Sequence, residues 1–510
     1  MAPRSLRAAV AAASIGLLLL IAPSGGSIVP ADQDKDTVGA KGPGRTVLPV
    51  NQIVTPFGTQ STLPGLRPQA LALSPDGKLL AVAGKTHELV ILDALTGRIA
   101  QQVALPAEEQ EEQHPEAVSP MILDPDEKGQ LSYTGLIFAP GGRRIYMSNV
   151  DGSIKIFSVG PDGTVEPSHT FPLPLTGAPR RAEEIPAGLA VTPDGKRLYV
   201  CGNLSNRLLE LDTETGEVVR TFDVGVAPFD VVLAGGKAYV SNWGGRRPMP
   251  GDLTGPAGRG TEVRVDPVRH IASEGSVSVV DLAAGALKTE VLVHLHASAL
   301  ALSPDGRWVV CANAASDNLS VIATATDTVA ETIWAKSSPA DLFGASPNAL
   351  AFSRDGKTLY VANGTQNAVA AIKFKPRGRK SRLKGLIPVG WFPGALALDE
   401  RRGTLYVANI KGHAVEPAES RPSGAPGFNS HMYHGSVSFF PEPRQKQLWD
   451  LTVIVDTNFR RERMRQALQK PRPGQPARPV PERIGEPSVF KHVVYIIKEN
   501  RTYDQVLGDV

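Results

Sequence analysis

The last residues of the chain carry side chains whose types and spacing suit ligand or metal binding. Glu499 and Asn500 directly follow Phe490–Lys498 (FKHVVYIIK), a continuous apolar β run. Such a run is typical of a strand buried on both faces of an α/β sheet, and these sheets bind ligands at the carboxyl ends of their strands. A carboxylate and an amide supply hard oxygen donors that suit a divalent cation. The alternative is a strand followed by a solvated turn.

The wider motif, His492–Asp509 (HVVYIIKENRTYDQVLGD), resembles the opening of the phosphoesterase family within the alkaline-phosphatase-like superfamily. That family's first strand ends in Glu-Asn-Arg-Ser/Thr-aromatic-Asp, and the matching residues here are Glu499, Asn500, Arg501, Thr502, Tyr503 and Asp504. The resemblance implies that Glu499 and Asn500 are metal ligands and that a divalent metal ion is the cofactor of the complete domain. It also implies hydrolysis of phosphoesters.

Hydrolysis of this kind needs a nucleophilic Ser or Thr and further Asp and His ligands, which would come from downstream of Val510. Thr502 stands too close to the first ligands to be assumed the nucleophile. We therefore expect the 510-residue chain to be a truncated copy without hydrolytic activity.

A second set of potential ligands lies between two strand-like runs near residue 420. It comprises His413, Glu416, Glu419, His431 and His434. A His-x-x-His pair with nearby carboxylates could bind zinc. Proline and glycine surround it and no third ligand has a fixed spacing, so a polar loop that contacts a partner or a domain is the preferred interpretation.

Basic side chains gather in two further places. The first group could dock an anion, although a solvated loop is favoured; it contains Arg246, Arg247, Arg259, Arg264, Arg269 and His270. The second group forms a basic hairpin tip, to which we assign no function because charge runs are usually solvated; it contains Arg377, Arg379, Lys380, Arg382 and Lys384.

The elements that must position these residues come from a repeat, whose clearest copy is Pro186–Gly225. Four short runs with apolar alternation are separated by turn residues, which is the signal for antiparallel strands. Thr192–Gly195 (TPDG) suits a tight hairpin, because proline presets φ and glycine accepts positive φ. A single meander of this size cannot bury its apolar faces, so it needs neighbours.

Seven such units follow one another: Pro68–Leu105, Ser132–Leu173, Pro186–Gly225, Ala227–Val293, Ala297–Trp334, Pro347–Val389 and Pro393–Val455. They predict an all-β fold, a seven-bladed β-propeller of four-stranded antiparallel blades. Eight blades or two separate sheets are the alternatives. We expect the lone strand Arg45–Phe57 to complete the last blade and close the ring. A linker and the first strand of a truncated α/β domain follow.

Three units contain a further signature, Tyr-Val-Ala/Ser-Asn, at Tyr239–Asn242, Tyr360–Asn363 and Tyr406–Asn409. It resembles the YVTN-type propeller repeat. The resemblance concerns the fold, because such propellers serve many functions.

The long insertions are expected on one end of the ring. In a meander the first and third turns lie at one end, and the second turn and the crossover lie at the other. Gly244–Glu274 and Ile410–His434 are second-turn insertions, while Pro106–Gln130 and Pro174–Ile185 are crossovers. We call this end the loop-rich face and expect it to contact a phosphoesterase domain or an envelope protein.

The remaining composition sets the class of protein. Residues 1–26 have the charged, apolar and small-residue order of a secretory signal, and an uncleaved anchor is the alternative. Residues 27–44 are predicted to be a disordered lead, and residues 45–456 the propeller. Residues 457–487 are predicted to form a basic helix (Phe459–Lys470) and a Pro-rich linker, and residues 488–510 the phosphoesterase-like fragment. No transmembrane span is expected beyond the signal. The protein is expected to be exported, periplasmic or extracellular, and monomeric.

A net charge of +3 is too small to imply nucleic-acid binding. Cys201 and Cys311 occupy equivalent places in different units, too far apart to form a disulfide. The favoured function is an exported propeller module of a metal-dependent phosphoesterase. The alternative is a stand-alone envelope or secreted propeller that binds or scaffolds without catalysis.

Overall fold

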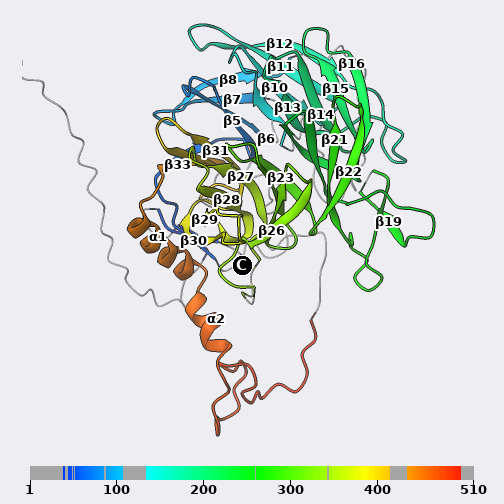
Figure 1. The fold of residues 1–510 in the computed structure, drawn as a ribbon. Helices are drawn as coiled ribbons and strands as arrows, with labels where there is room; N and C mark the ends of the chain where they lie inside the picture. Colours follow the sequence, from blue (N-terminus) through cyan, green and yellow to red (C-terminus); the bar gives the residue numbers. More distant parts are fainter. Residues whose placement is uncertain are drawn as a thin grey trace, which may run out of the picture. The chain divides into compact units, whose positions relative to one another are not determined.

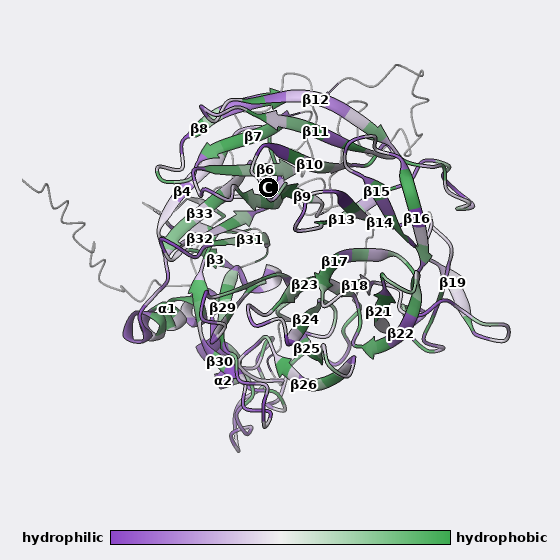
Figure 2. Ribbon diagram, turned by 45° about the horizontal axis from the view of Figure 1, so that its top comes forward, coloured by the Kyte–Doolittle hydropathy of each residue, from purple (hydrophilic) through white to green (hydrophobic). Residues whose placement is uncertain are grey.

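Seven four-stranded antiparallel sheets are arranged in a ring (Figure 1, Figure 2). The computed structural model describes residues 38–40, 44–48, 50, 52–84, 88–106, 134–258, 260–339, 341, 344–413 and 434–495. All of them fall within one compact unit, Val38–Val510. The predicted seven-bladed β-propeller is confirmed.

Each predicted unit forms one blade. Blade 1 consists of β5 (Pro68–Leu73), β6 (Leu79–Gly84), β7 (Glu88–Asp93) and β8 (Ile99–Ala104). Blade 2 consists of β9 (Leu136–Phe138), β10 (Arg144–Asn149), β11 (Ser153–Val159) and β12 (Val165–Pro172). Blade 3 consists of β13 (Pro186–Val191), β14 (Arg197–Gly202), β15 (Arg207–Asp212) and β16 (Val218–Asp223). Blades 4 and 5 are β17 (Pro228–Ala234), β18 (Lys237–Asn242), β21 (Gly275–Asp281) and β22 (Ala286–Val293); and β23 (Ala297–Leu302), β24 (Trp308–Asn313), β25 (Asn318–Ala323) and β26 (Thr328–Trp334). Blades 6 and 7 are β27 (Pro347–Phe352), β28 (Thr358–Asn363), β29 (Ala368–Lys373) and β30 (Arg382–Pro388); and β31 (Pro393–Asp399), β32 (Thr404–Asn409), β33 (Gly435–Pro441) and β4 (Thr59–Leu63).

The recurring Pro-Asp-Gly sequence has the turn geometry expected of it. In blade 3, Asp194 Oδ1 accepts the hydroxyl of Thr192 at 2.5 Å and the backbone N–H of Lys196 at 3.1 Å. Gly195 has φ 72°, a conformation that glycine adopts at no steric cost. The repetition of Asp and Gly therefore reflects hairpin geometry and not chemistry.

The tyrosine of the Tyr-Val-x-Asn signature ties its blade to the next one. The hydroxyl of Tyr239 in blade 4 donates to Asp327 in blade 5 at 2.5 Å, and that of Tyr360 in blade 6 donates to Glu442 after β33 at 2.7 Å. Tyr406 in blade 7 donates to the carbonyl of Ala94 in blade 1, also at 2.7 Å. Because buried hydroxyls need partners, these bonds fix neighbouring blades at one end of the ring.

The asparagine of the signature binds within its own blade. Asn409 is fully buried, and its Nδ2 donates to the hydroxyls of Ser436 at 3.1 Å and Ser438 at 2.9 Å. Asn242 makes the same pair of bonds to Ser276 and Ser278. The side chain thus joins the second and third strands where the second turn leaves the blade.

The ring closes as predicted, but the closing strand is different. β4, not Arg45–Phe57, pairs with β33 and completes blade 7. β1 (Gly39–Ala40), β2 (Thr46–Val47) and β3 (Ile53–Val54) instead form a small sheet of their own. The fourth strand of a blade lies at the outer edge and needs little apolar surface, so the polar sequence TQSTL suits it and the apolar run does not.

Helix α1 (Gln445–Asn458) covers the end of the seventh predicted unit, Pro393–Val455, so that unit does not continue as strand to Val455. β4 already occupies the free edge of β33, so the chain cannot add another strand there. Leu448, Leu451 and Val455 are buried at helical spacing and pack against the outer side of blade 6 (Figure 1). Gly385 of β30 permits the contact, because a Cβ there would lie 2.5 Å from Thr452 Oγ1.

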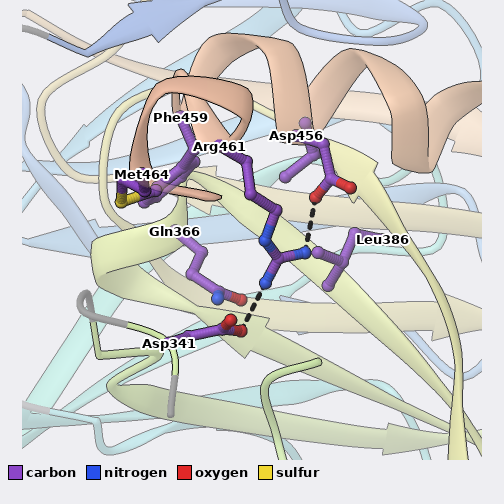
Figure 3. A pocket seen from close by; sticks show the side chains of 8 residues that line it. Asp341, Gln366, Leu386, Asp456, Phe459, Arg461 and Met464 are labelled. Carbon is purple, nitrogen blue, oxygen red and sulfur yellow. Dashed lines mark hydrogen bonds and ion pairs between the residues drawn. The ribbon is translucent and has the colours of Figure 1, made fainter. Parts of the chain in front are cut away.

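Helix α2 (Arg461–Ala467) is shorter than the predicted helix Phe459–Lys470 and begins with an arginine that is held on both sides. The Arg461 guanidinium contacts Asp456 of α1 at 2.7 Å and also reaches Asp341 in the crossover from blade 5 to blade 6 (Figure 3). A third bond, 3.0 Å long, goes to the Ser337 hydroxyl. The side chain is 13% exposed, so these contacts dock the start of the C-terminal segment onto the ring.

The expected strand Phe490–Lys498 is not formed in its described part, residues 490–495. A strand buried on both faces needs partner strands on its edges, and none of the described residues supplies one. Phe490, Val493, Val494 and Tyr495 are 60–85% exposed. This stretch is therefore an uncovered apolar segment.

Two further sequence expectations concern cysteine and membrane spans. Cys201 and Cys311 are both buried and free, as predicted. Within the described part of the chain, no helix combines the length and apolar character that crossing a membrane requires. Residues 1–37, which include the expected signal, lie outside the described residues.

Candidate functional site

The loop-rich face carries its largest described loop on blade 4. Gly244–Glu274 leaves between β18 and β21, as expected of a second-turn insertion, and contains a hairpin of β19 (Thr254–Pro256) and β20 (Glu262–Arg264). The hairpin projects from the ring beside β22 (Figure 1). We call this loop the insertion arm.

Arg246, a predicted anion-docking residue, is already paired at the base of the arm. Its Nε and Nη2 donate to the two carboxylate oxygens of Glu274 at 2.9 and 2.8 Å. The hydrogen bonds that Arg246 donates to Glu274 raise the pKa of Arg246. Arg264 pairs with Asp252 at 2.6 Å in the same loop. These side chains hold the arm in shape, which leaves them little capacity for an external anion.

Arg247 has a similar structural role. Its Nε donates to the carbonyl of Val224 at 2.7 Å, and its Nη2 donates to the carbonyl of Asn206 at 2.5 Å and to Asp223 at 3.1 Å. The guanidinium therefore ties the arm to blade 3. Arg246 and Arg247 lie side by side in sequence but point to different partners, so they do not form a joint anion site.

The arm presents apolar side chains to solvent. Met249, Leu253, Val268 and Ile271 are 46–84% exposed. A neighbouring crossover contributes Leu175, which is 74% exposed. Exposed apolar side chains collected on one loop are typical of a contact surface. The prediction for this loop considered its charges and did not include these apolar residues, which stand singly in the sequence.

The predicted histidine cluster is only partly within the described residues. His413 and His434 stand at the two ends of their insertion, and those ends meet, since a Cβ on Gly412 would lie 2.0 Å from the His434 carbonyl oxygen. His431, Glu416 and Glu419 lie outside the described residues. The carbonyl of His413 accepts the Thr46 hydroxyl at 2.8 Å, which places the small β1–β3 sheet against this loop.

Burial lowers the pKa of His413, so its ring stays neutral near pH 7. Its Nδ1 is buried and has no hydrogen-bond partner in the described structure. A neutral imidazole with a free nitrogen is competent to bind a metal. No group of three His, Cys, Asp or Glu residues among those described could hold a metal ion, however, so a zinc site stays a prediction.

An aromatic stack lies where blades 4 and 5 meet on the loop-rich face. The rings of Phe229 and Trp243 are stacked with centroids 4.6 Å apart, and His296 follows at 5.8 Å. Trp243 Nε1 is buried and makes no hydrogen bond to any described residue. No sequence pattern indicates this stack, because its members come from two blades.

Asp230 is an unexpected acid on the innermost strand of blade 4, β17. Its Oδ1 accepts the N–H of Val231 at 2.9 Å and its Oδ2 accepts the N–H of Leu300 in blade 5 at 2.8 Å. Desolvation raises the pKa of the carboxyl to about 6, although the two N–H groups lower it. Asp230 therefore joins two blades while being poorly solvated.

The raised pKa of Asp230 predicts a pH effect on stability. The folded protein binds this proton more tightly than the unfolded chain, so the contribution is largest below about pH 4 and is lost as the pH rises through about 6. The loss is up to about 3 kcal/mol. Urea unfolding at pH 4 to 7 should show this slope in the wild type and a flatter profile in Asp230→Asn. The control Asp281→Asn, at the third turn of the same blade, should keep the slope. Parallel profiles for wild type and Asp230→Asn would contradict the assignment.

Glu499 and Asn500, the ligands implied by the phosphoesterase resemblance, lie outside the described residues. Their donor set of one carboxylate and one amide oxygen suits a hard divalent cation. It is incomplete by itself, and the remaining ligands would have to come from other residues.

No protein-family model matches the sequence, and no curated protein matches it. Among solved structures, the chain is similar to one titled "Kuenenia stuttgartiensis Hydrazine Synthase", with 18% identity, a TM-score of 0.49, and coverage of 71% of this chain and 97% of that chain. It is also similar to one titled "Structure of U3-55K", with 12% identity, a TM-score of 0.50, and coverage of 74% and 97%. At this identity the likeness concerns the fold alone. The chain is a seven-bladed β-propeller.

Proposed function

We propose that this chain is the propeller module of an exported, metal-dependent phosphoesterase. The observation that carries the proposal is the uncovered apolar segment at residues 490–495, which leads directly into the Glu499–Asp504 motif. An apolar run that is 60–85% exposed at Phe490, Val493, Val494 and Tyr495 needs a covering surface. The remainder of an α/β hydrolase domain would provide one.

The path to that segment supports the same proposal. α1 is packed on blade 6 and Arg461 ties α2 to Asp341, so the chain leaves the ring at a defined place. Beyond α2, Arg472 pairs with Glu482 at 2.9 Å and with Glu486 at 2.7 Å, which folds the proline-rich stretch back on itself. A hydrolase domain attached here would be held near the ring and not on a free tether.

In this proposal Glu499 and Asn500 hold the divalent metal ion. When bound, the metal would act as a Lewis acid on a phosphoryl oxygen. The loop-rich face, with the exposed apolar side chains of the insertion arm, would contact the hydrolase domain or an envelope partner.

The test begins with the coding sequence downstream of Val510. The full-length product is purified and assayed for hydrolysis of bis(p-nitrophenyl) phosphate with Mg²⁺, Mn²⁺ or Zn²⁺, and its metal content is measured by mass spectrometry. We expect Glu499→Ala and Asn500→Ala each to lower kcat/KM by about 100-fold or more and to reduce bound metal. Glu462→Ala, on the exposed face of α2, is the matched control and should change neither.

The stand-alone binding protein is the second candidate, favoured by the exposed Met249, Leu253, Val268 and Ile271 of the insertion arm. It predicts no hydrolase sequence after Val510. Absence of coding sequence for a nucleophile and for Asp and His ligands would reject the phosphoesterase proposal in its favour. Hydrolysis that survives both substitutions would reject Glu499 and Asn500 as the metal ligands.

A further inference from the structure

A groove of about 440 Å³ lies between blades 5 and 6, on the face opposite the loop-rich face. It is lined by the first turns of these two blades and by the third turn of blade 6, between β29 and β30. The two blades touch at its floor, where a Cβ on Gly356 would lie 3.4 Å from Pro304. The volume is within the range of small-molecule sites.

The charges in the groove are unbalanced. Its two carboxylates are already paired, Asp305 with Arg307 at 2.5 Å and Asp355 with Lys357 at 3.2 Å. Three further cations line the groove, Arg354, Lys375 and Arg377, and all three are exposed. Within the described part of the chain, their charged heads have no ion pair or hydrogen bond. The groove therefore has free positive charge beside neutralised acids.

The repeat provides an internal comparison that singles out this groove. The second strand of each blade begins with Leu, Arg, Arg, Lys, Trp, Thr and Thr in blades 1 to 7, so Trp308 of blade 5 is the one aromatic residue at this position. Trp308 is partly buried against the core and also lines the groove. Hairpin geometry does not require an aromatic residue there.

A second departure from the repeat, in blade 6, lies at the same groove as Trp308. β7, β15 and β21 each end in an aspartate, Asp93, Asp212 and Asp281, which accepts backbone N–H groups of the third turn. In blade 6 the equivalent residue is Lys373, followed by Phe374, and the turn is longer and basic. Blade 6 therefore has a cation and an aromatic residue where blades 1, 3 and 4 have a turn-forming aspartate, and blade 5 adds Trp308 to the same groove.

We propose that this groove binds a phosphate-bearing ligand. Arg354 and Arg377 would contact the phosphate, because the guanidinium fork matches its oxygens and the group carries more than one negative charge. Lys375 would add a third positive charge. Trp308 would pack against the ring or apolar part attached to the phosphate. The proposed site includes neither Glu499 nor Asn500 and does not depend on the proposed hydrolase.

The same chemistry could come from a soluble sugar phosphate or from a phospholipid headgroup, and two assays distinguish them. The first is calorimetric titration of the 510-residue chain with glucose 1-phosphate, with glucose and inorganic phosphate for comparison. The second is co-sedimentation with vesicles of phosphatidylcholine containing 20% phosphatidic acid, against pure phosphatidylcholine. Both are repeated at higher NaCl, which should weaken binding.

Arg354→Gln with Arg377→Gln should weaken binding about tenfold or more. The matched control is Arg98→Gln with Lys196→Gln, which removes two exposed charges from equivalent turns of blades 1 and 3 on the same face. Trp308→Phe keeps the charges and should weaken the sugar phosphate more than inorganic phosphate. All variants are checked for native circular dichroism.

Saturable binding of glucose 1-phosphate that only the groove variants weaken would support the proposal with a soluble ligand. Sedimentation with the phosphatidic acid vesicles that only these variants reduce would support it with a headgroup. No binding in either assay, or equal losses in the groove and control variants, would overturn it.

Discussion

Replacing Asp327 by asparagine should lower the free energy of unfolding by about 3 kcal/mol, because it leaves the largely buried ammonium of Lys237 without its partner. The Asp327 side chain is 2% exposed and contacts Lys237 Nζ at 2.6 Å, Lys288 Nζ at 2.8 Å and the Tyr239 hydroxyl. Asparagine is chosen because Asp327 has φ 54°, which asparagine tolerates, as Asn206 does at φ 57°. The loss of stability then results from the missing negative charge and not from backbone strain. Urea unfolding at pH 7 measures it.

The control for Asp327→Asn is Glu462→Gln, since Glu462 pairs with Arg465 at 3.7 Å on an exposed helix surface. Its effect should be within about 0.5 kcal/mol. Burial raises the pKa of Asp327, but bonds from Lys237, Lys288 and Tyr239 outweigh this and lower it. The stabilisation is therefore present above about pH 4 and is lost as the pH falls through the lowered pKa, so the two proteins should converge in acid. An unchanged midpoint at pH 7 would contradict the role assigned to this network.

Gly435→Ala should be comparably damaging, at about 3 kcal/mol, because it strains the point where the ring closes. Gly435 begins β33, and its N–H donates to the Leu66 carbonyl at 2.8 Å. A Cβ there would lie 2.0 Å from Cδ of Pro68, the first residue of β5, and 2.7 Å from the oxygen of Leu66, in the connection between β4 and β5. The new methyl group has to push blade 7 away from blade 1.

Gly141→Ala is the matched control, since a Cβ at Gly141 meets no atom within 4 Å and its φ is not positive. It should change stability by less than about 0.5 kcal/mol, or raise it slightly by restricting the unfolded chain. Thermal unfolding and urea midpoints measure both. Equal effects of the two alanine substitutions would show that blades 7 and 1 can move apart at little cost, and would contradict the role assigned to Gly435.

The sequence predicted the ring well because each blade repeats the same local information. Turn residues such as Thr192–Gly195 and the alternation of the strands specify a meander without reference to the rest of the chain, and seven copies leave one way to bury their faces. The insertion arm and the face it occupies followed from counting turns. These inferences depend on residues close together in sequence.

The errors concern pairings between distant residues. The closure of blade 7 depends on the pairing of β33 with β4, a strand more than 370 residues earlier. The β4 sequence, TQSTL, has no apolar pattern that would predict a strand. Once β4 is in place, the residues after β33 are free to form α1 although Val453–Val455 are β-branched. Arg246 and Arg247 read as free cations because Glu274 and the Val224 carbonyl lie elsewhere in sequence.

The candidate sites divide in the same way. The Glu499–Asp504 motif could be identified in the sequence because its proposed ligands are adjacent, while the groove between blades 5 and 6 could not. Trp308 reads as an ordinary strand residue and Arg377 as part of a solvated turn. Only the ring places them beside each other and beside Arg354.

The closure by β4 also determines how the molecule would respond to a mechanical load between its two ends. β4 and β33 are antiparallel, with Thr59 opposite Phe439, so tension applied before β4 and after β33 would peel the pair apart one bond at a time. Two contacts would have to break before the load reaches this strand pair. Asn458 Nδ2 donates to Thr55 Oγ1 at 2.8 Å, and the Phe57 N–H donates to the Pro388 carbonyl at 2.9 Å. The contact between helix α1 and the residues before β4 must therefore break before β4 can separate from β33 and open the ring.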